Sequence, residues 1–258
     1  DLWLDLKSGK VSVDTLVSIS GISELKEISM CDGRIRIGAA VTHGEVASSP
    51  VIRQRAPLLA QACGSVGSVQ TRNVGTVVGN VINAQPAADA AVALVALGAE
   101  AEIRDENGVS YTPVEKLYAG VGKSKIDSSR QLVTAVTFSA LRKNQGSAFV
   151  RLAQRRAMAL PVLNVAVVVT LASNKIEEIR IVCAPVGPQP MRAYTAERVL
   201  AGAEPLEEKI LEAARLAAEE ADPRDSAVRG SRAYRKAVLP ALVRRAVSEA
   251  VAAAVASS

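Results

Sequence analysis

The chain has 258 residues, of which 49% are hydrophobic and 22% charged, a balance typical of one or two folded globular domains rather than of a disordered chain. Its net charge of +5 does not predict a nucleic-acid partner, because Lys and Arg are scattered among Asp and Glu without interleaved aromatic residues. Three isolated cysteines and a single histidine give no support to a disulfide scaffold or a zinc site, and no apolar run is long enough to span a bilayer, so we expect a cytoplasmic protein.

The first part of the chain is predicted to combine strands with short helices. Residues 34–37 alternate charged and apolar side chains, as a half-buried strand does. Thr42 and Glu45 have the spacing of a capping box, and Ser49-Pro50 offers a second N-cap followed by proline at the first helical position. A helix over residues 58–63 is expected to end at the glycine that follows it.

Residues 64–83 are predicted to form a long functional loop, because glycine alternates there with Ser, Thr and Asn without clear periodicity. Within it, residues 75–80 suit an anion such as a diphosphate: the glycines let consecutive N–H groups converge, and Thr76 and Asn80 add polar side chains. A plain tight turn is an equally common outcome for an isolated glycine-rich loop. The segment matches neither a Walker A loop nor a GxGxxG loop.

The next elements are a helix and a hairpin. Residues 86–97 begin with a proline and become apolar, which predicts a buried helix closed by Gly98. Residues 102–104 and 109–111 are predicted to pair as strands around the turn at Asn107-Gly108.

The middle of the chain is rich in predicted strands. Residues 131–138 form one, and the polar segment 142–146 is the best candidate for a domain boundary. Residues 164–171 and 176–182 are predicted to form a hairpin that turns at residues 173–175.

The remainder is predicted to be helical. Residues 193–200 should end at Gly202, residues 206–221 should end at an Asp-Pro pair, and a last helix from Ser231 should be interrupted at Pro240. The chain therefore consists of an α/β half followed by strands and then helices, without internal repeats.

Two stretches in the glycine-rich region resemble a family signature. RNVGTVVGN (residues 72–80) and NAQPAAD (residues 83–89) resemble the pattern RNxGTxGGN…NxSPAAD of the FAD-binding subunits of molybdenum hydroxylases. This family includes the flavin components of xanthine dehydrogenase and carbon monoxide dehydrogenase. Further similar segments follow in the family's order at residues 1–29, 38–42, 155–166, 184–192 and 228–235.

The resemblance implies an α+β fold in two parts. Residues 1–144 would form a truncated two-part FAD-binding domain of the vanillyl-alcohol-oxidase or PCMH type, without its N-terminal subdomain. Residues 145–258 would form a C-terminal domain with an antiparallel sheet and helices, like that of the carbon monoxide dehydrogenase flavoprotein. The chain starts at Asp1-Leu2, where the family's opening flavin loop AGGTDL ends, so we expect that it is truncated and that residue 1 lies where a strand passes into a loop.

The resemblance also implies a flavin site whose members come from both parts of the chain: Thr42, Gly75, Thr76, Val78, Gly79, Asn80, Asp89, Leu132 and Arg151. Thr76, Gly79 and Asn80 would contact the diphosphate and ribityl region. Asp89 would accept a hydrogen bond from FAD, and Arg151 would place a cation near the isoalloxazine.

Plainer alternatives exist for several of these residues. Thr42 is a helix cap on any interpretation, Asp89 could complement a helix dipole, and Arg151 could form a surface salt bridge. Arg229 and Tyr234 are expected to pack between the domains. We expect no catalytic residue and no metal ligand in this chain.

The function implied by the resemblance is that of an electron relay. A molybdenum cofactor on a large subunit would oxidise the substrate, two-iron two-sulfur clusters on a small subunit would carry the electrons, and FAD on this subunit would deliver them to NAD or another acceptor. The assembly implied is a dimer of heterotrimers.

Two departures from the family pattern support an alternative. The opening glycine loop is missing. In addition, Val78 stands where the family has a glycine, and this departure matters because a β-branched residue resists positive φ and could obstruct a phosphate. The alternative is a flavin-free structural subunit of the same kind of complex. A stand-alone FAD oxidase is a weaker third possibility, because the chain has no room for a substrate domain.

Overall fold

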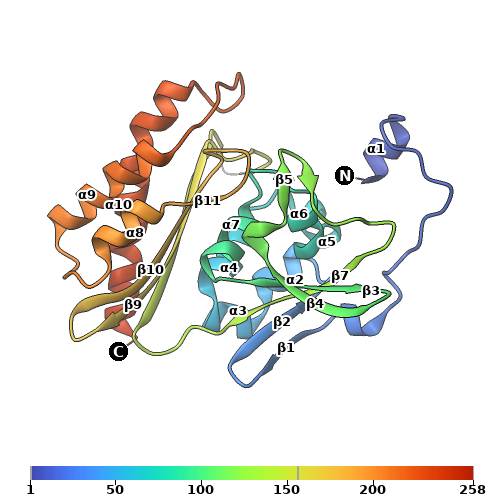
Figure 1. Cartoon of the computed structure of the whole chain (residues 1–258), viewed down its shortest axis with the longest axis horizontal. Coiled ribbons are helices and arrows are strands. Elements are labelled where there is room, and N and C mark those ends of the chain that lie inside the picture. The colour runs from blue at the N-terminus through green and yellow to red at the C-terminus, as the bar shows by residue number, and fades with distance from the viewer. Residues whose placement is uncertain (1, 156, 258) are drawn as a thin grey trace.

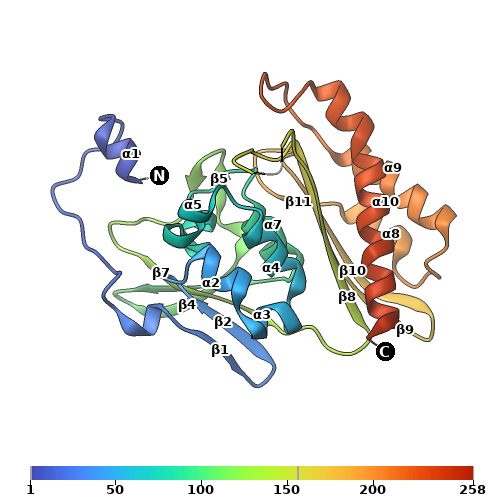
Figure 2. The ribbon, with the colours of Figure 1, turned by 180° about the vertical axis from the view of Figure 1, so that it is seen from behind.

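The computed structural model describes residues 2–155 and 157–257 (Figure 1). The chain folds into four successive layers: a five-stranded sheet, a group of short helices, a four-stranded sheet and a group of longer helices. Figure 2, seen from behind, shows the same order. Arg156, which belongs to one of the segments similar to the family, lies outside the described residues.

The five-stranded sheet is antiparallel throughout, and its strands are β1 (Ile28–Cys31), β2 (Arg34–Gly38), β3 (Glu100–Asp105), β4 (Gly108–Pro113) and β7 (Leu132–Ser139). Their order is β1-β2-β7-β3-β4, so the last strand in sequence lies at the centre, where all but its two end residues are buried. The strands predicted over residues 34–37, 102–104, 109–111 and 131–138 are thus confirmed. Short elements complete this half: η1 (Ser23–Leu25), η2 (Val114–Lys116), β5 (Tyr118–Gly120) and β6 (Lys123–Ser124).

The layer of short helices comprises α2 (His43–Ser48), α3 (Pro50–Arg55), α4 (Pro57–Gly64), α5 (Val69–Val74), α6 (Val77–Ile82) and α7 (Asp89–Ala96). The predicted caps at Thr42 and Ser49 are present, the first as a full capping box. Every residue of α7 is buried, and Gly98 follows it with a φ of +64°. Burial on all sides explains why this helix is apolar apart from its first residue, Asp89.

The prediction of a long loop over residues 64–83 is wrong. The segment contains α5 and α6, each begun by a hydroxyl side chain that accepts a hydrogen bond from the backbone: Ser68 from Thr71 and Thr76 from Gly79. The two helices could not be recognised in the sequence because each has only six residues, too few for apolar periodicity to be visible, and the segment is rich in glycines and short polar residues.

The four-stranded sheet is also antiparallel, in the order β11-β10-β9-β8, and its strands are β8 (Gln145–Leu152), β9 (Leu163–Ala172), β10 (Lys175–Ala184) and β11 (Met191–Arg192). The predicted hairpin between β9 and β10 is confirmed, with Ser173 and Asn174 at positive φ in the turn. Both faces of β9 are covered. Val165 and Val167 join the core below the longer helices, whereas Ala166 and Val168 pack towards the short ones, as expected for alternating side chains.

The longer helices are α8 (Tyr194–Leu200), α9 (Glu207–Glu220) and α10 (Arg232–Ala256), and they cover the outer face of the four-stranded sheet (Figures 1 and 2). The predicted interruption at Pro240 is wrong, because α10 is continuous through it. A proline inside a helix costs about 3 kcal/mol. The packing of α10 along β8, β9 and α9 outweighs that local cost.

The N-terminal segment projects from this body (Figure 1). It begins with α1 (Leu2–Lys7), none of whose residues is buried, and Trp3 is 70% exposed. A helix thus stands where we expected a strand to pass into a loop, and residue 1 itself lies outside the described residues. Within the described part of the chain, no helix combines the length and the apolar character needed to cross a bilayer.

Candidate functional site

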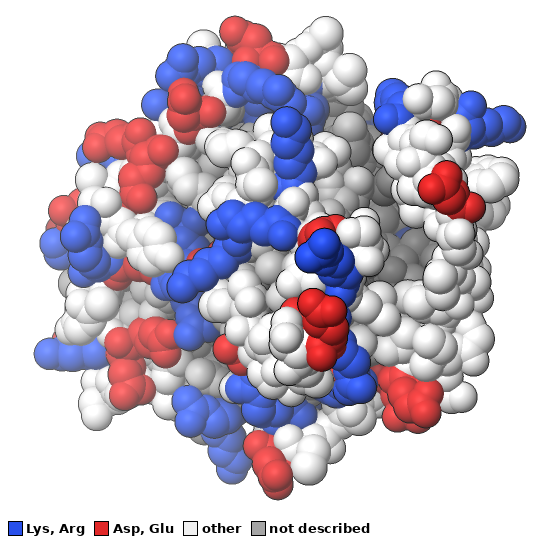
Figure 3. All heavy atoms as spheres, turned by 45° about the vertical axis from the view of Figure 1, so that its right-hand side comes forward, with Lys and Arg blue, Asp and Glu red and all other residues white. Residues whose placement is uncertain are grey.

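A cavity of about 720 Å³ lies where the α1 segment, the short helices and the turn after β8 meet. Figure 3 shows a hollow between the projecting N-terminal segment and the body of the molecule. Two of the predicted site residues, Asn80 and Asp89, line the cavity. The remaining lining residues are Leu4, Asp5, Lys10, Val66, Gly67, Ser68, Thr71, Asn83, Gln85, Ala87, Ala88, Met158, Ala159, Leu160 and Arg229.

Hydrogen bonds join two separate segments beside α6. The N–H of His43 donates to the carbonyl of Gly75 at 2.9 Å, and Thr42 and Thr76 form an isolated antiparallel bridge. Thr42 is also fixed by its capping box, since its N–H donates to Glu45 Oε2 at 2.7 Å. These predicted residues therefore hold the start of α6 in place and do not line the cavity themselves.

In place of the predicted amide nest lies a helix start at which three N–H groups already have partners within the protein. The N–H of Gly79 donates to Thr76 Oγ1 and that of Asn80 to the Thr76 carbonyl, both at 3.0 Å. The N–H of Val77 donates to the carbonyl of Val41 at 3.1 Å. A Cβ at Gly79 would lie 2.8 Å from Thr76 Oγ1, so the glycine makes room for the cap.

The expectation that Val78 occupies a position of positive φ, which a β-branched residue resists, is also wrong. Val78 lies inside α6, outside the left-handed region, and only 4% of it is exposed. Its side chain joins the core with Val77 and Val81. A valine is suited to this position because it fills apolar space, and it does not enter the cavity.

Asn80 presents an unused acceptor at the cavity. Its Oδ1 is buried and has no hydrogen-bond partner within the described residues. A buried amide oxygen without a partner costs about 1–3 kcal/mol, so a ligand hydroxyl that donates to it would remove that cost. The side chain is therefore suited to a sugar or polyol.

Asp89 forms a buried network at the start of α7. Its Oδ1 accepts hydrogen bonds from Asn164 Nδ2 at 2.7 Å and from Arg151 Nε at 3.1 Å, whereas no described residue donates to Oδ2. Burial raises the pKa of Asp89 above its ordinary value of 3.8, and the charge of Arg151 and the hydrogen bond from Asn164 act against that rise. The cavity thus contains a carboxylate with one oxygen available to a donor.

Arg151 links this carboxylate to the turn after β8. Its side chain is 12% exposed, so the alternative of a surface salt bridge is wrong: the ion pair with Asp89 is buried. Its Nη2 also donates to the carbonyl of Ala159 at 2.5 Å, in the part of the turn that lines the cavity. Met158 in the same turn donates its N–H to the Gly67 carbonyl at 3.2 Å. Arg151 therefore positions both the acid and one wall of the cavity.

Arg229 is a lining residue that the sequence did not indicate. We expected it to pack between domains, but it lines the cavity, and its Nε is buried without a partner among the described residues. Burial and the charge of Arg224 lower the pKa of Arg229. A cation in this condition suits an anionic ligand. Tyr234, expected in the same role, is 51% exposed.

Leu132 and His43 lie apart from this arrangement. Leu132 begins β7, pairs with Arg104, and is not among the residues that line the cavity. His43 is buried, and burial together with the charge of Arg72 lowers its pKa to about 4, so its imidazole is neutral at pH 7. No acidic, cysteine or histidine cluster of the described residues could hold a metal ion. The geometry of the cavity thus suits binding of a polar anionic ligand.

Two family models match the chain. One, described as the FAD binding domain in molybdopterin dehydrogenase, matches residues 1–139. The other, described as the CO dehydrogenase flavoprotein C-terminal domain, matches residues 148–250.

Known proteins match most of the chain. It is 31% identical over 241 residues to a putative xanthine dehydrogenase FAD-binding subunit of Escherichia coli K12, covering 93% of this chain and 82% of that protein. It is 30% identical to a xanthine dehydrogenase FAD-binding subunit of Escherichia coli O157:H7, with the same coverage. A solved chain of carbon monoxide dehydrogenase from Hydrogenophaga pseudoflava, lacking the Mo-pyranopterin moiety of its cofactor, superposes with a TM-score of 0.91 at 26% identity, covering 97% of this chain and 86% of that one.

Proposed function

Since the chain belongs to the family of FAD-binding subunits of molybdenum hydroxylases, we propose that its cavity beside Asn80 and Asp89 binds FAD and that the chain is the electron-transfer subunit of a multi-subunit oxidoreductase. The two-part α+β fold and the family predicted from the sequence are confirmed. When bound, FAD supplies the redox chemistry, and the protein supplies position and electrostatic environment.

The observation that carries this proposal is the set of unused polar atoms around one cavity. Among the described residues, none donates to the buried Oδ1 of Asn80 or to Asp89 Oδ2, and none accepts a hydrogen bond from Arg229 Nε. A flavin dinucleotide brings sugar hydroxyls for the two acceptors and a diphosphate for the cation, and 720 Å³ is within the range of small-molecule sites.

In this proposal, most of the remaining predicted residues position the residues that line the cavity and do not contact FAD themselves. Thr42, Gly75, Thr76, Val78 and Gly79 hold α6, and α6 in turn presents Asn80. Arg151 orients Asp89 and the turn at Ala159. A direct contact from Leu132 remains a prediction that rests on resemblance alone.

The partners are proposed from the relatives, whose names call them subunits or medium chains. We propose a large molybdopterin-binding subunit and a small subunit with two-iron two-sulfur clusters, assembled as a dimer of heterotrimers in the cytoplasm. NAD or another acceptor would take the electrons. No side chain at the cavity is required as a general base.

One observation favours the second candidate, a flavin-free structural subunit. The amides of Val77, Gly79 and Asn80 are all bonded within the protein, so they offer no donors to a diphosphate. The two candidates differ in whether the cavity is filled in the working complex.

Release of flavin tests the two candidates directly. The complex is purified, denatured, and the released yellow chromophore is quantified against protein; we expect stoichiometric FAD. Asn80→Ala should weaken FAD binding about tenfold through the loss of one buried acceptor. Asn73→Ala is the matched control, because Asn73 is exposed in the same region and does not line the cavity. A complex that assembles but releases no flavin would favour the structural subunit.

A further inference from the structure

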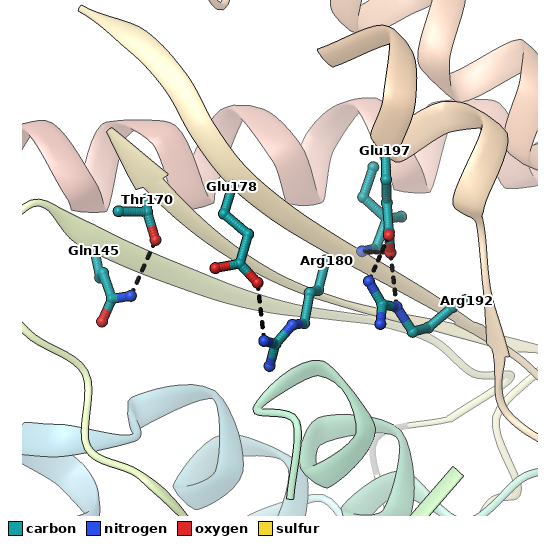
Figure 4. Close-up of polar contacts among 7 residues, drawn as sticks. Gln145, Thr170, Glu178, Arg180, Arg192 and Glu197 are labelled. Carbon is teal, nitrogen blue, oxygen red and sulfur yellow. Dashed lines mark hydrogen bonds and ion pairs between the residues drawn. The ribbon is translucent and has the colours of Figure 1, made fainter. Parts of the chain in front are cut away.

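A second large cavity lies between the two halves of the molecule, apart from the proposed flavin site. This groove has a volume of about 770 Å³, slightly more than the flavin cavity, and shares no lining residue with it. One wall is the face of the four-stranded sheet that looks towards the short helices, and Figure 4 shows Glu178 and Arg180 projecting from that face, with Gln145 and Thr170 farther along it. The other wall comes from the β1–β2 turn, the ends of α3, α7 and β7, and the segment that joins the halves.

The charge of the groove is unbalanced. Its described lining contains more cations than acids, namely Arg34, Arg55, Arg142, Lys143 and Arg180 against Asp32 and Glu178. Arg34 pairs with Glu100 at 3.0 Å and Arg180 with Glu178 at 2.8 Å. No described acid lies within ion-pair distance of the other three cations.

Hydrogen bonds fix the segments of chain that carry the three unpaired cations. The N–H of Leu141 donates to the carbonyl of Arg55 at 2.8 Å, which sets the end of α3 beside the segment that carries Arg142 and Lys143. The N–H of Arg142 donates to Gln145 Oε1 at 2.9 Å, and Gln145 in turn donates to Thr170 Oγ1 at 3.0 Å. The cations therefore sit on a fixed backbone against the sheet.

Arg180 extends the cationic lining across to the other half. A Cβ at Gly98 would lie 2.0 Å from Arg180 Nη1, so the guanidinium lies directly over this glycine at the end of α7. Between these charges the groove also has apolar walls, formed by Met30, Leu97, Leu141 and Val168. A ligand that fits must combine several negative charges with an apolar body.

We propose that this groove binds a phosphorylated small molecule of nucleotide size, with its phosphates at Arg55, Arg142 and Lys143 and its ring system between Leu97 and Val168. Arginine guanidinium groups match phosphate oxygens with paired hydrogen bonds, and the volume suits such a ligand. Because both halves contribute walls, the ligand stabilises their arrangement. The site is independent of the flavin proposal.

The test is calorimetric titration of the purified full chain with ADP and, separately, with inorganic pyrophosphate, while flavin absorbance is monitored to exclude exchange at the other cavity. We expect ADP to bind and to raise the melting temperature. Arg142→Ala and Lys143→Ala should each weaken ADP binding about tenfold, and the double variant about a hundredfold. Lys175→Ala, an exposed cation outside the groove, is the matched control and should change nothing.

The apolar part of the proposal has its own readout. Pyrophosphate should bind more weakly than ADP, and Val168→Asp should weaken ADP more than pyrophosphate. The proposal is overturned if ADP does not bind at millimolar concentration, or if binding is equal in the Arg142/Lys143 double variant. It is also overturned if the isolated chain binds ADP but the assembled complex does not, with residues 141–145 protected from hydrogen exchange in the complex, because a partner subunit would then occupy the groove.

Discussion

Two buried carboxylates in this protein each pair with an arginine, but their pKa values shift in opposite directions. Glu102 in β3 accepts hydrogen bonds from Nε and Nη2 of Arg36, at 3.2 and 2.9 Å, and a third from the hydroxyl of Thr134 at 2.6 Å. Hydrogen bonding to Arg36 lowers the pKa of Glu102 below 4.5. Asp89 accepts only one hydrogen bond from its arginine, because Arg151 also donates to the carbonyl of Ala159. Burial raises the pKa of Asp89.

The difference separates a structural ion pair from a site. Three hydrogen bonds satisfy Glu102 within the sheet, so little remains for a ligand to add. Asp89 is buried to a similar degree but is less completely bonded, and it lines a cavity. A carboxylate whose environment opposes its charge is a common feature of functional sites, whereas a fully bonded one is typical of a framework.

The largest effect is expected from removal of the buried acid. Asp89→Ala should lower the free energy of unfolding by about 3 kcal/mol at neutral pH, because Arg151 would remain buried without its counter-ion. Urea unfolding of the variant and of wild type measures this difference. Asp89→Asn is the companion variant, since it retains the shape while removing the charge. A loss below about 1 kcal/mol would mean that Arg151 finds another partner and that the pair does not organise the cavity.

The second prediction uses the sign of the Asp89 shift. The pKa of Asp89 is higher in the folded than in the unfolded state. Protonation of Asp89 therefore stabilises the fold fully below the unfolded pKa near 3.8, and this stabilisation is lost as the pH rises through the folded pKa. Arg151→Gln removes the charge that lowers this pKa, so the folded value rises further. The variant should therefore be close to wild type in mild acid and less stable by about 2 kcal/mol at neutral pH. Unfolding free energies measured across that range test it, and a constant difference would contradict the assignment.

The third prediction concerns Glu102, whose pKa is shifted in the opposite direction to that of Asp89. Because the folded pKa of Glu102 is lowered, its contribution is full above the unfolded value near 4.5 and is lost as the pH falls through the folded value. Glu102→Gln should cost about 1 kcal/mol at pH 7, a modest value because Arg36 is partly exposed, and almost nothing in strong acid. The Glu102→Gln difference should be complete by about pH 4.5, whereas the Arg151→Gln difference should develop above pH 3.8 and grow towards neutral pH. If the Glu102→Gln difference kept growing well above pH 4.5, the distinction between the two carboxylates would fail.

Much of this architecture could be predicted from local sequence signals. The capping box at Thr42, the apolar helix before Gly98 and the hairpin at Ser173-Asn174 each depend on neighbouring residues alone, and the structure confirms all three. The errors arose where tertiary packing decides. Pro240 stays helical because α10 is covered by a sheet and a second helix, and α5 and α6 depend on caps within a glycine-rich stretch.

The site was predictable only in part, for the same reason. The resemblance singled out Asn80 and Asp89, which line the cavity, and Arg151, which contacts Asp89. It could not indicate that Arg151 and Asp89 form one pair, because 62 residues separate them and no local pattern links β8 to α7. Arg229 reaches the cavity from a still more distant segment, and in sequence it looked like any packing arginine.

The smallest effect on the free energy of unfolding is expected from an exposed ion pair, which serves as the reference for the buried ones. Arg34–Glu100 spans β7 between the same two strands as Arg36–Glu102, two residues along, but its side chains are 51% and 38% exposed against 31% and 9%. Water already solvates both charges, so Glu100→Gln should change the unfolding free energy by at most about 0.5 kcal/mol, and added salt should reduce even that difference. Thermal or urea unfolding at low and high salt provides the measurement. A Glu100→Gln cost as large as that of Glu102→Gln would show that position in the sheet, rather than burial and the third hydrogen bond from Thr134, sets the strength of these pairs.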